Sequence, residues 1–187
     1  QEATELVMPH VAPIAASPLA NHFLIAYLEA AARMPEAPSS VDEVAYPLLA
    51  AGNDNALQAD AHYLMALHRW RQGPDSNGYD ALATFASSYP ESPYCDQALF
   101  LAARAADAVA GHQRQASELR LALVEKHPQS PLAAEAYLCL LPTEELKLLS
   151  PVARRHLNHL AVLFPSSPLS LLAPLANGAS LAKRSME

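Results

Sequence analysis

A five-residue phrase occurs three times along this chain and constrains its fold more than any other feature. The copies are Tyr89-Pro90-Glu91-Ser92-Pro93, His127-Pro128-Gln129-Ser130-Pro131 and Phe164-Pro165-Ser166-Ser167-Pro168. Their first prolines lie 38 and then 37 residues apart. A fixed period of this size is typical of proteins built from repeated units that stack in one direction. The phrase therefore predicts a repeat solenoid, an architecture that usually serves binding.

Each copy combines residues that end one helix with residues that begin the next. A proline just past a helix end cannot continue the hydrogen-bond ladder. Serine is a preferred N-terminal cap, and proline fits the first helical turn. The caps and first-turn prolines that we expect are Ser92-Pro93, Ser130-Pro131 and Ser167-Pro168. The alternative interpretation of Ser-Pro is a linker or a site of proline-directed phosphorylation.

The same phase extends into the N-terminal half. Ser17-Pro18 lies two periods before Ser92-Pro93, and the break Gly52-Asn53-Asp54-Asn55 falls between them. First helices are therefore expected to begin near residues 18, 56, 93, 131 and 168. Second starts follow Ser39-Ser40, Gly73-Pro74-Asp75-Ser76, Gly111-His112 and Ser150-Pro151. Each repeat is thus predicted to be a helical hairpin.

The composition favours an all-α fold. The chain of 187 residues has 38 Ala and 30 Leu but only 2 Ile and 8 Val, and strands prefer β-branched residues. Hydrophobic residues make up 51% and charged residues 17%, which indicates a globular protein. We expect one solenoid domain at 17–187, made of repeats 17–54, 55–91, 92–129 and 130–166 and a capping helix at 167–187. Residues 1–16 are predicted to be a flexible lead-in.

Several functional classes fit the sequence poorly. The net charge is −7 without a basic stripe, which argues against nucleic-acid binding. No apolar run approaches the roughly 20 residues that a bilayer-spanning helix needs. Phosphate-loop and nucleophile motifs are missing, so we expect neither an enzyme nor a cofactor. His156 and His159 could face one way on a helix, but zinc takes three or four ligands, so no metal is expected. Cys95 and Cys139 leave a disulfide and free thiols both open.

The residues from Ala98 to Pro128 resemble the tetratricopeptide repeat. They resemble in particular the variant of bacterial cell-envelope proteins such as the Tol-Pal accessory protein and the outer-membrane assembly lipoprotein, whose repeats end in an aromatic residue, Pro, a variable residue and Ser. Residues that match the small, large and proline positions of the second helix are Ala153, Leu157, Leu160 and Pro165. The period is longer than the roughly 34 residues of the common repeat.

The resemblance implies a right-handed superhelix of about four hairpins whose first helices line a groove. By position, the groove residues would be Tyr63, Leu67, Trp70, Arg71, Leu101, Arg104 and Ala105. Tyrosine, tryptophan and arginine are common binding anchors, although a stripe such as Tyr63, Leu67 and Trp70 is also typical of core packing. The resemblance also implies a location in the bacterial periplasm or at the outer membrane, with the cytoplasm as the alternative. Because the chain starts at Gln1, we expect either that processing removed a preceding segment or that the chain is a fragment.

These observations lead to one main hypothesis and two alternatives. The main hypothesis is a non-catalytic scaffold that holds a peptide or domain of a partner protein in the groove. The first alternative is a structural component of an envelope or secretion assembly that self-associates through the apolar helix 97–110. The second is a cytosolic chaperone of the tetratricopeptide type.

Overall fold

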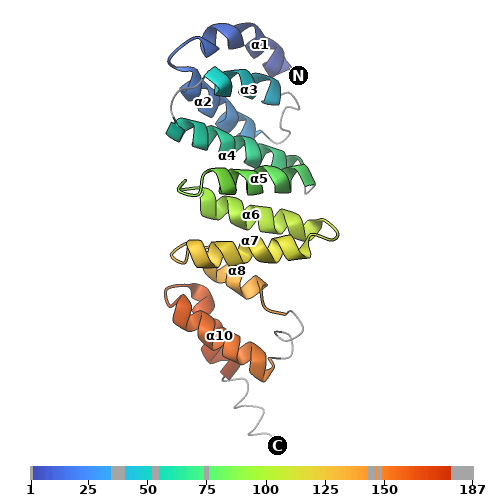
Figure 1. Ribbon diagram of the computed structural model, residues 1–187, viewed down its shortest axis with the longest axis vertical. Helices are drawn as coiled ribbons and strands as arrows, with labels where there is room; N and C mark the ends of the chain where they lie inside the picture. Colours follow the sequence, from blue (N-terminus) through green and yellow to red (C-terminus); the bar gives the residue numbers. More distant parts are fainter. Residues whose placement is uncertain are drawn as a thin grey trace, which may run out of the picture. The chain divides into compact units, whose positions relative to one another are not determined.

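The structure is a computed structural model that describes residues 2–34, 41–51, 55–73, 76–142, 146 and 149–177. Helices occupy most of these residues and none of them lies in a strand, which confirms the all-α prediction for this part of the chain (Figure 1). The elements are α1 (Glu2–Ala15), α2 (Ala20–Arg33), α3 (Val41–Ala51), α4 (Asn55–Gln72), α5 (Ser76–Ser88), α6 (Cys95–Ala108), α7 (Gln113–Lys126), α8 (Ala133–Cys139), α10 (Pro151–Leu163) and the 3₁₀ helix η1 (Pro168–Leu171).

The chain divides into two compact units, residues 1–112 and 113–187. The first unit contains α1 to α6, and the second contains α7, α8, α10 and η1. Each unit is described by itself. The single domain at 17–187 and the right-handed superhelix stay predictions.

Helices begin close to the positions that the repeat predicts. The expected first-helix starts near 18, 56, 93, 131 and 168 correspond to Ala20, Asn55, Cys95, Ala133 and Pro168. The second helices start at Val41, Ser76, Gln113 and Pro151. The predicted breaks at Ser39-Ser40, Gly52-Asn53-Asp54 and Pro74-Asp75, and the end of the cap at 178–187, lie outside the described residues.

One hydrogen-bonded turn recurs at four serines, Ser17, Ser92, Ser130 and Ser167. In each turn the serine Oγ accepts a hydrogen bond from the backbone N–H two residues later, at 3.2 or 3.3 Å. The serine carbonyl accepts from the N–H three residues later, at 3.0 or 3.1 Å. The serine N–H donates to the carbonyl three residues earlier. The Ser-Pro pairs of this sequence therefore mark four turns that are held by the same three hydrogen bonds.

The turns at Ser92 and Ser130 correct the expected position of the caps, and the turn at Ser17 has the same arrangement. The N-caps of α2, α6 and α8 are Leu19, Tyr94 and Leu132, which make no side-chain cap bond. Each α-helix starts two residues after the proline, because the bond from the serine carbonyl to the third residue closes a tighter, 3₁₀-like turn first. Ser167 differs, since it is the N-cap of η1 with a proline at the first position.

Helix α1 corrects the flexible lead-in that the sequence predicted for residues 1–16. Pro9 and Pro13 lie inside this helix, and both are exposed. They are four residues apart, so they share the side of the helix where water can satisfy the carbonyls that proline leaves unpaired. Val11 is buried and packs with Ile14 in the core of the first unit. Burial of this face explains why the segment is helical.

The core of the first unit gathers the apolar faces of α2, α3 and α4. Side chains with at most 5% exposure follow helical spacing in Ala20, Leu24, Leu28 and Ala31 on α2 and in Val41, Val44, Ala45 and Leu48 on α3. Ala61 and Met65 of α4 complete this cluster. Each large side chain buried in this way stabilises the fold by roughly 1.5–3 kcal/mol.

The packing of α4 against α5 depends on Gly78. A Cβ atom at this position would lie 2.9 Å from the Cα atom of Trp70. Glycine therefore allows the backbones of α4 and α5 to approach closely. This approach places the outer side chains of α4 and α5 next to one another.

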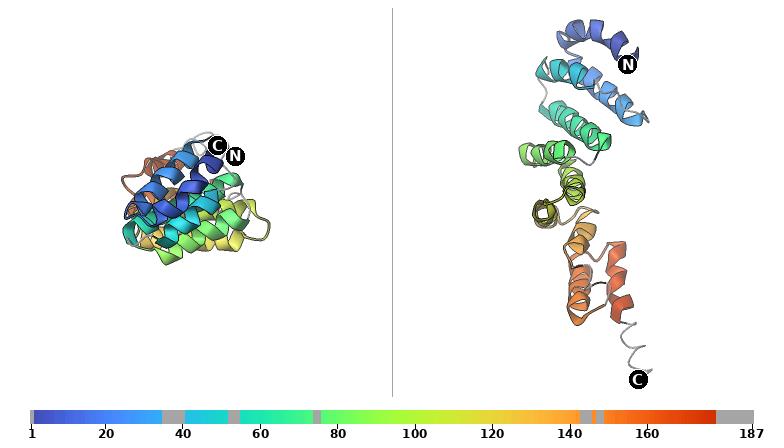
Figure 2. Two further views of the ribbon diagram at one scale, coloured as in Figure 1. Left: turned by 90° about the horizontal axis from the view of Figure 1, so that it is seen from above. Right: turned by 90° about the vertical axis from the view of Figure 1, so that its right-hand side faces the viewer.

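The second unit has its core on α8 and α10. Leu160 is fully buried and packs with Ala133, Ala134 and Phe164. On the same helix, Leu157 packs with Ala173 and Ala176 of the helical residues 172–177, which run beside α10 (Figure 2). Ser150 caps α10 by accepting a hydrogen bond from the Ala153 N–H at 3.1 Å.

Candidate functional site

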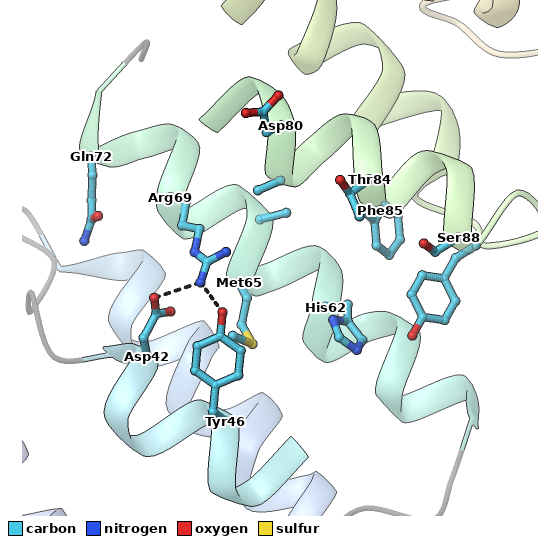
Figure 3. A pocket seen from close by; sticks show the side chains of 13 residues that line it. Asp42, Tyr46, His62, Met65, Arg69, Gln72, Asp80, Thr84, Phe85 and Ser88 are labelled. Carbon is cyan, nitrogen blue, oxygen red and sulfur yellow. Dashed lines mark hydrogen bonds and ion pairs between the residues drawn. The ribbon is translucent and has the colours of Figure 1, made fainter. Parts of the chain in front are cut away.

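The first unit has a cleft of about 670 Å³ between α3, α4 and α5 (Figure 3). Helix α4 supplies its floor, and α3 and α5 supply its two sides. The lining side chains are Asp42, Tyr46, His62, Met65, Ala66, Arg69, Gln72, Asp80, Ala81, Thr84, Phe85, Ser88 and Tyr89. We call this the α3–α5 cleft.

Helical spacing explains why these residues face one space. On α4, residues 62, 65, 66, 69 and 72 recur every three or four positions and so lie on one face. Asp42 and Tyr46 are four residues apart on α3, which also aligns them. The cleft is therefore built from one stripe on each of three helices, and its geometry is fixed by helix packing.

Arg69 of α4 joins the floor of the cleft to its α3 side. Its Nη2 atom lies 2.8 Å from Asp42 Oδ2 and also donates to the Tyr46 hydroxyl. The guanidinium carbon sits 5.7 Å from the centre of the Tyr46 ring, within the range of a cation–π contact. Burial opposes the charge, but the hydrogen bonds that Arg69 donates to Asp42 and Tyr46, with the attraction of both groups, outweigh it and raise the Arg69 pKa.

Asp42 uses only one of its two oxygens in this arrangement. Oδ2 accepts from Arg69, whereas Oδ1 is buried and has no hydrogen-bond partner among the described residues. An ionised carboxylate oxygen without a donor costs free energy, and the neighbouring guanidinium offsets part of that cost. The pairing with Arg69 is therefore the interaction that fixes the position of the Asp42 carboxylate.

A histidine and two aromatic rings line the other end of the cleft. His62 lies 5.4 Å, centre to centre, from Tyr89, and Phe85 lies 5.3 Å from Tyr89. Burial lowers the His62 pKa, which favours the neutral imidazole near pH 7. A neutral imidazole can donate one hydrogen bond and accept another. This end of the cleft therefore offers flat apolar surfaces and one adaptable polar group.

Two of the predicted groove residues, Tyr63 and Ala105, are buried in the first unit. Tyr63 is only 5% exposed, stacks on Tyr94 at 4.6 Å and donates its hydroxyl hydrogen bond to Gln97 Oε1 at 3.0 Å. Ala105 is 1% exposed. Their side chains cannot face a partner in this conformation. Tyr63 is therefore a core packing residue, which was the alternative interpretation of its stripe.

The other predicted residues do not line the α3–α5 cleft. Leu67, Trp70 and Leu101 are half-buried, whereas Arg71 and Arg104 are exposed. Their assignment to a partner-binding groove stays a prediction. Most of α6 is buried, in Cys95, Ala98, Leu99, Ala102, Ala103, Ala105 and Ala106, so much of the apolar helix 97–110 is not available for self-association.

Sequence reasoning chose a neighbouring face of α4 and so missed the cleft. The stripe of Tyr63, Leu67 and Trp70 is displaced by about one residue from the cleft stripe of His62, Ala66 and Arg69. Both stripes have helical spacing, and the predicted one has the larger aromatic residues. The signal that could have found the cleft is the pairing of the Arg69 charge with an acidic residue on the preceding helix.

Two further predictions concerned a disulfide between the cysteines and the absence of a membrane-spanning helix. Cys95 is buried, Cys139 is exposed, and both are free. Among the described residues, no helix has the length together with the apolar character that crossing a bilayer requires.

No protein-family model, curated protein or solved structure matches this chain. Its function must therefore be inferred from the residues of its own structure.

Proposed function

We propose that the protein is a non-catalytic scaffold that binds a segment of a partner protein in the α3–α5 cleft. The observation that carries this proposal is the cleft itself, an open space of about 670 Å³ in which apolar floor residues meet aromatic, guanidinium and imidazole groups. Ligand sites commonly combine an apolar lining with a few polar groups that set orientation.

The composition of the cleft supports a protein partner. Tyrosine and arginine are enriched among the residues that dominate binding energy at protein interfaces. Tyr46 is 50% exposed, and Arg69 retains part of its side chain at the surface while Asp42 fixes its position. A side chain that is already ordered loses less entropy when a partner binds.

The repeated turn supports a solenoid of the tetratricopeptide type. The same bonds occur at Ser17, Ser92, Ser130 and Ser167, and a helix begins within three residues of each. We extend the proposal to a right-handed superhelix and, through the resemblance, to a role in bacterial envelope biogenesis in the periplasm. A cytosolic chaperone of the same type is the alternative location and role.

Self-association is a second candidate function, favoured by the surface of the second unit. Large apolar side chains remain exposed there, with Val162 at 76%, Leu171 at 63% and Leu175 at 68%. Exposed apolar groups of this size often mark interaction surfaces. Sedimentation of the wild-type chain and of Val162→Ser tests it: a concentration-dependent dimer that the substitution weakens supports self-association, and a monomer at high concentration rejects it.

Selection from a random peptide library on the immobilised full chain tests the main proposal. Peptides that bind the wild-type protein should lose at least about tenfold in affinity to Arg69→Ala, or about 1.4 kcal/mol. Arg104→Ala is the matched control, because it removes an exposed arginine from the face that the resemblance implied. Circular dichroism verifies that both variants remain helical.

The two variants separate the outcomes. Loss of binding in Arg69→Ala with retention in Arg104→Ala supports the α3–α5 cleft. Loss of binding in Arg104→Ala with retention in Arg69→Ala would instead place the partner in the predicted groove. Equal affinity for the wild type and both variants rejects both sites.

A further inference from the structure

Two helices of the second unit bring one tyrosine and two histidines together. The Tyr137 hydroxyl on α8 lies 3.4 Å from His156 Nδ1 and 3.1 Å from His159 Nδ1, both on α10. The histidines are three residues apart, so they share a face of α10. The same ring nitrogen of each histidine is directed at one oxygen atom.

The two distances from the Tyr137 oxygen to the imidazole nitrogens match those between neighbouring ligand atoms around a bound metal ion. Bonds of about 2.0–2.1 Å to nitrogen place neighbouring ligand atoms roughly 2.9–3.4 Å apart, from right-angled to tetrahedral arrangements. The two measured distances, 3.1 and 3.4 Å, lie within this range. An ion could therefore replace the hydrogen bonds with little movement of the helices.

The surroundings support the geometry. Tyr137 lies 6.1 Å, ring centre to ring centre, from Phe164, whose side chain is buried in the core of α8 and α10. The tyrosine is thus oriented by packing. His159 is exposed, which leaves a path for an ion to enter and room for water to complete its coordination.

We propose that Tyr137, His156 and His159 form a binding site for a divalent transition-metal ion, with Cu²⁺ bound more tightly than Zn²⁺. Imidazole nitrogens suit both ions, and the general affinity order places Cu²⁺ first. Among the described residues no three His, Cys, Asp or Glu side chains gather in this way, and the phenol oxygen is what supplies a third donor. The site is separate from the α3–α5 cleft and does not depend on the proposed function.

The protons balance in a simple way. Tyr137 releases its hydroxyl proton to water and binds as phenolate, while both imidazoles bind through Nδ1 and carry their proton on Nε2. One proton leaves for each ion that binds, and no electron is transferred. The ion would tie α8 to α10 and so stabilise the second unit.

Titration of the full chain with CuCl₂ and then with ZnCl₂ tests the site. The titration uses the Cys139→Ser background, because an exposed thiol near the site could itself react with Cu²⁺. We expect one Cu²⁺ per chain, a visible absorption band from phenolate-to-copper charge transfer, and a higher melting temperature. Zn²⁺ should bind at the same place with at least about tenfold lower affinity, as the order of affinities implies.

Variants assign the donors. Tyr137→Phe should remove the absorption band and weaken Cu²⁺ binding by at least about tenfold, since even loss of a group that only supports a metal ligand costs about 10–100-fold in affinity. His156→Gln and His159→Gln should each weaken it at least as much. The matched control is His22→Gln, which removes an exposed histidine of the first unit and should leave the affinity unchanged.

Two results would overturn the proposal. One is wild-type affinity for Cu²⁺ no greater than that of the doubly substituted His156→Gln/His159→Gln chain. The other is a band and an affinity that survive Tyr137→Phe, which would exclude the tyrosine as a donor.

Discussion

Arg69 Nη2 and Asp42 Oδ2 lie 2.8 Å apart and join α4 to α3 along the edge of the cleft. Both side chains are partly exposed, at 31% and 43%, so water screens their attraction. The pair should therefore position a binding group more than it stabilises the fold. This distinction can be measured.

A double-mutant cycle of Arg69→Ala and Asp42→Ala should give a coupling of about 0.2–1 kcal/mol in the free energy of unfolding. Urea unfolding followed by fluorescence measures it, because the single tryptophan, Trp70, lies in the first unit. A coupling of several kcal/mol would show that the pair is a main structural contact instead.

Gly78→Ala should destabilise the first unit by about 1–3 kcal/mol, because the added Cβ would meet the backbone of Trp70 at 2.9 Å. Urea unfolding monitored by the fluorescence of Trp70 tests this. Gly73→Ala is the matched control, since a Cβ there would meet nothing within 4 Å. Equal stability of the two variants would contradict the close approach of α4 and α5.

Ser130→Ala should lower the stability of the second unit by about 0.5–1.5 kcal/mol, because the Oγ atom accepts a hydrogen bond from the Leu132 N–H at 3.2 Å. Ser166→Ala changes an exposed serine in the third copy of the phrase and should have little effect. Hydrogen exchange of peptides from the second unit distinguishes the two variants. Unchanged protection in Ser130→Ala would count against a stabilising role for the turn.

Leu160→Ala should cost about 2–5 kcal/mol, since the side chain is fully buried between α8 and α10. Val162→Ala, two residues away on the same helix, removes a side chain that is 76% exposed and should cost much less. Thermal unfolding followed by circular dichroism compares them. Similar melting temperatures would mean that α10 packs through a different face.

The first unit should lose stability as the pH falls below about 6.5. Burial lowers the pKa of His62 and of His68; for His68, Asp42 opposes the shift while Arg69 and Arg71 add to it. The unfolded chain therefore takes up protons at a higher pH than the folded chain, so the destabilisation begins near the ordinary histidine value and grows until the lowered pKa values are passed.

Urea unfolding of the first unit at several pH values, read from Trp70, should show this slope. His62→Gln and His68→Gln should each flatten it, whereas His22→Gln changes an exposed histidine and should not. A stability that stays level between pH 7 and pH 5 would exclude buried neutral histidines as the cause.

The positions of the helices could be predicted from the sequence because the residues that begin and end them act locally. A serine, a proline and the residues next to them determine a turn through bonds that span two or three positions. Even there the prediction erred by part of a turn, since propensities do not distinguish a 3₁₀ start from an α start. Helix α1 was not predicted, because its prolines disfavour a helix locally, whereas the burial of Val11 in the core of the first unit depends on residues far away in the sequence.

The cleft could not be predicted in the same way. Tyr63 and His62 are adjacent in sequence, yet the first stacks on Tyr94 inside the unit and the second faces open space. Which of two neighbouring stripes is buried depends on the rotation of α4 against other helices. That rotation is set by close contacts such as Gly78 with Trp70, which appear only in three dimensions.

The recurring serine turn also affects how such a chain can change length. Each copy begins and ends on the same local bonds, which do not involve distant residues. A duplicated stretch from Ser92 to Gln129 would begin and end at junctions that the chain already possesses. Gain or loss of a whole stretch between two such turns therefore requires no new junction, and we expect the number of these stretches to vary more readily in evolution than the packing within any one of them.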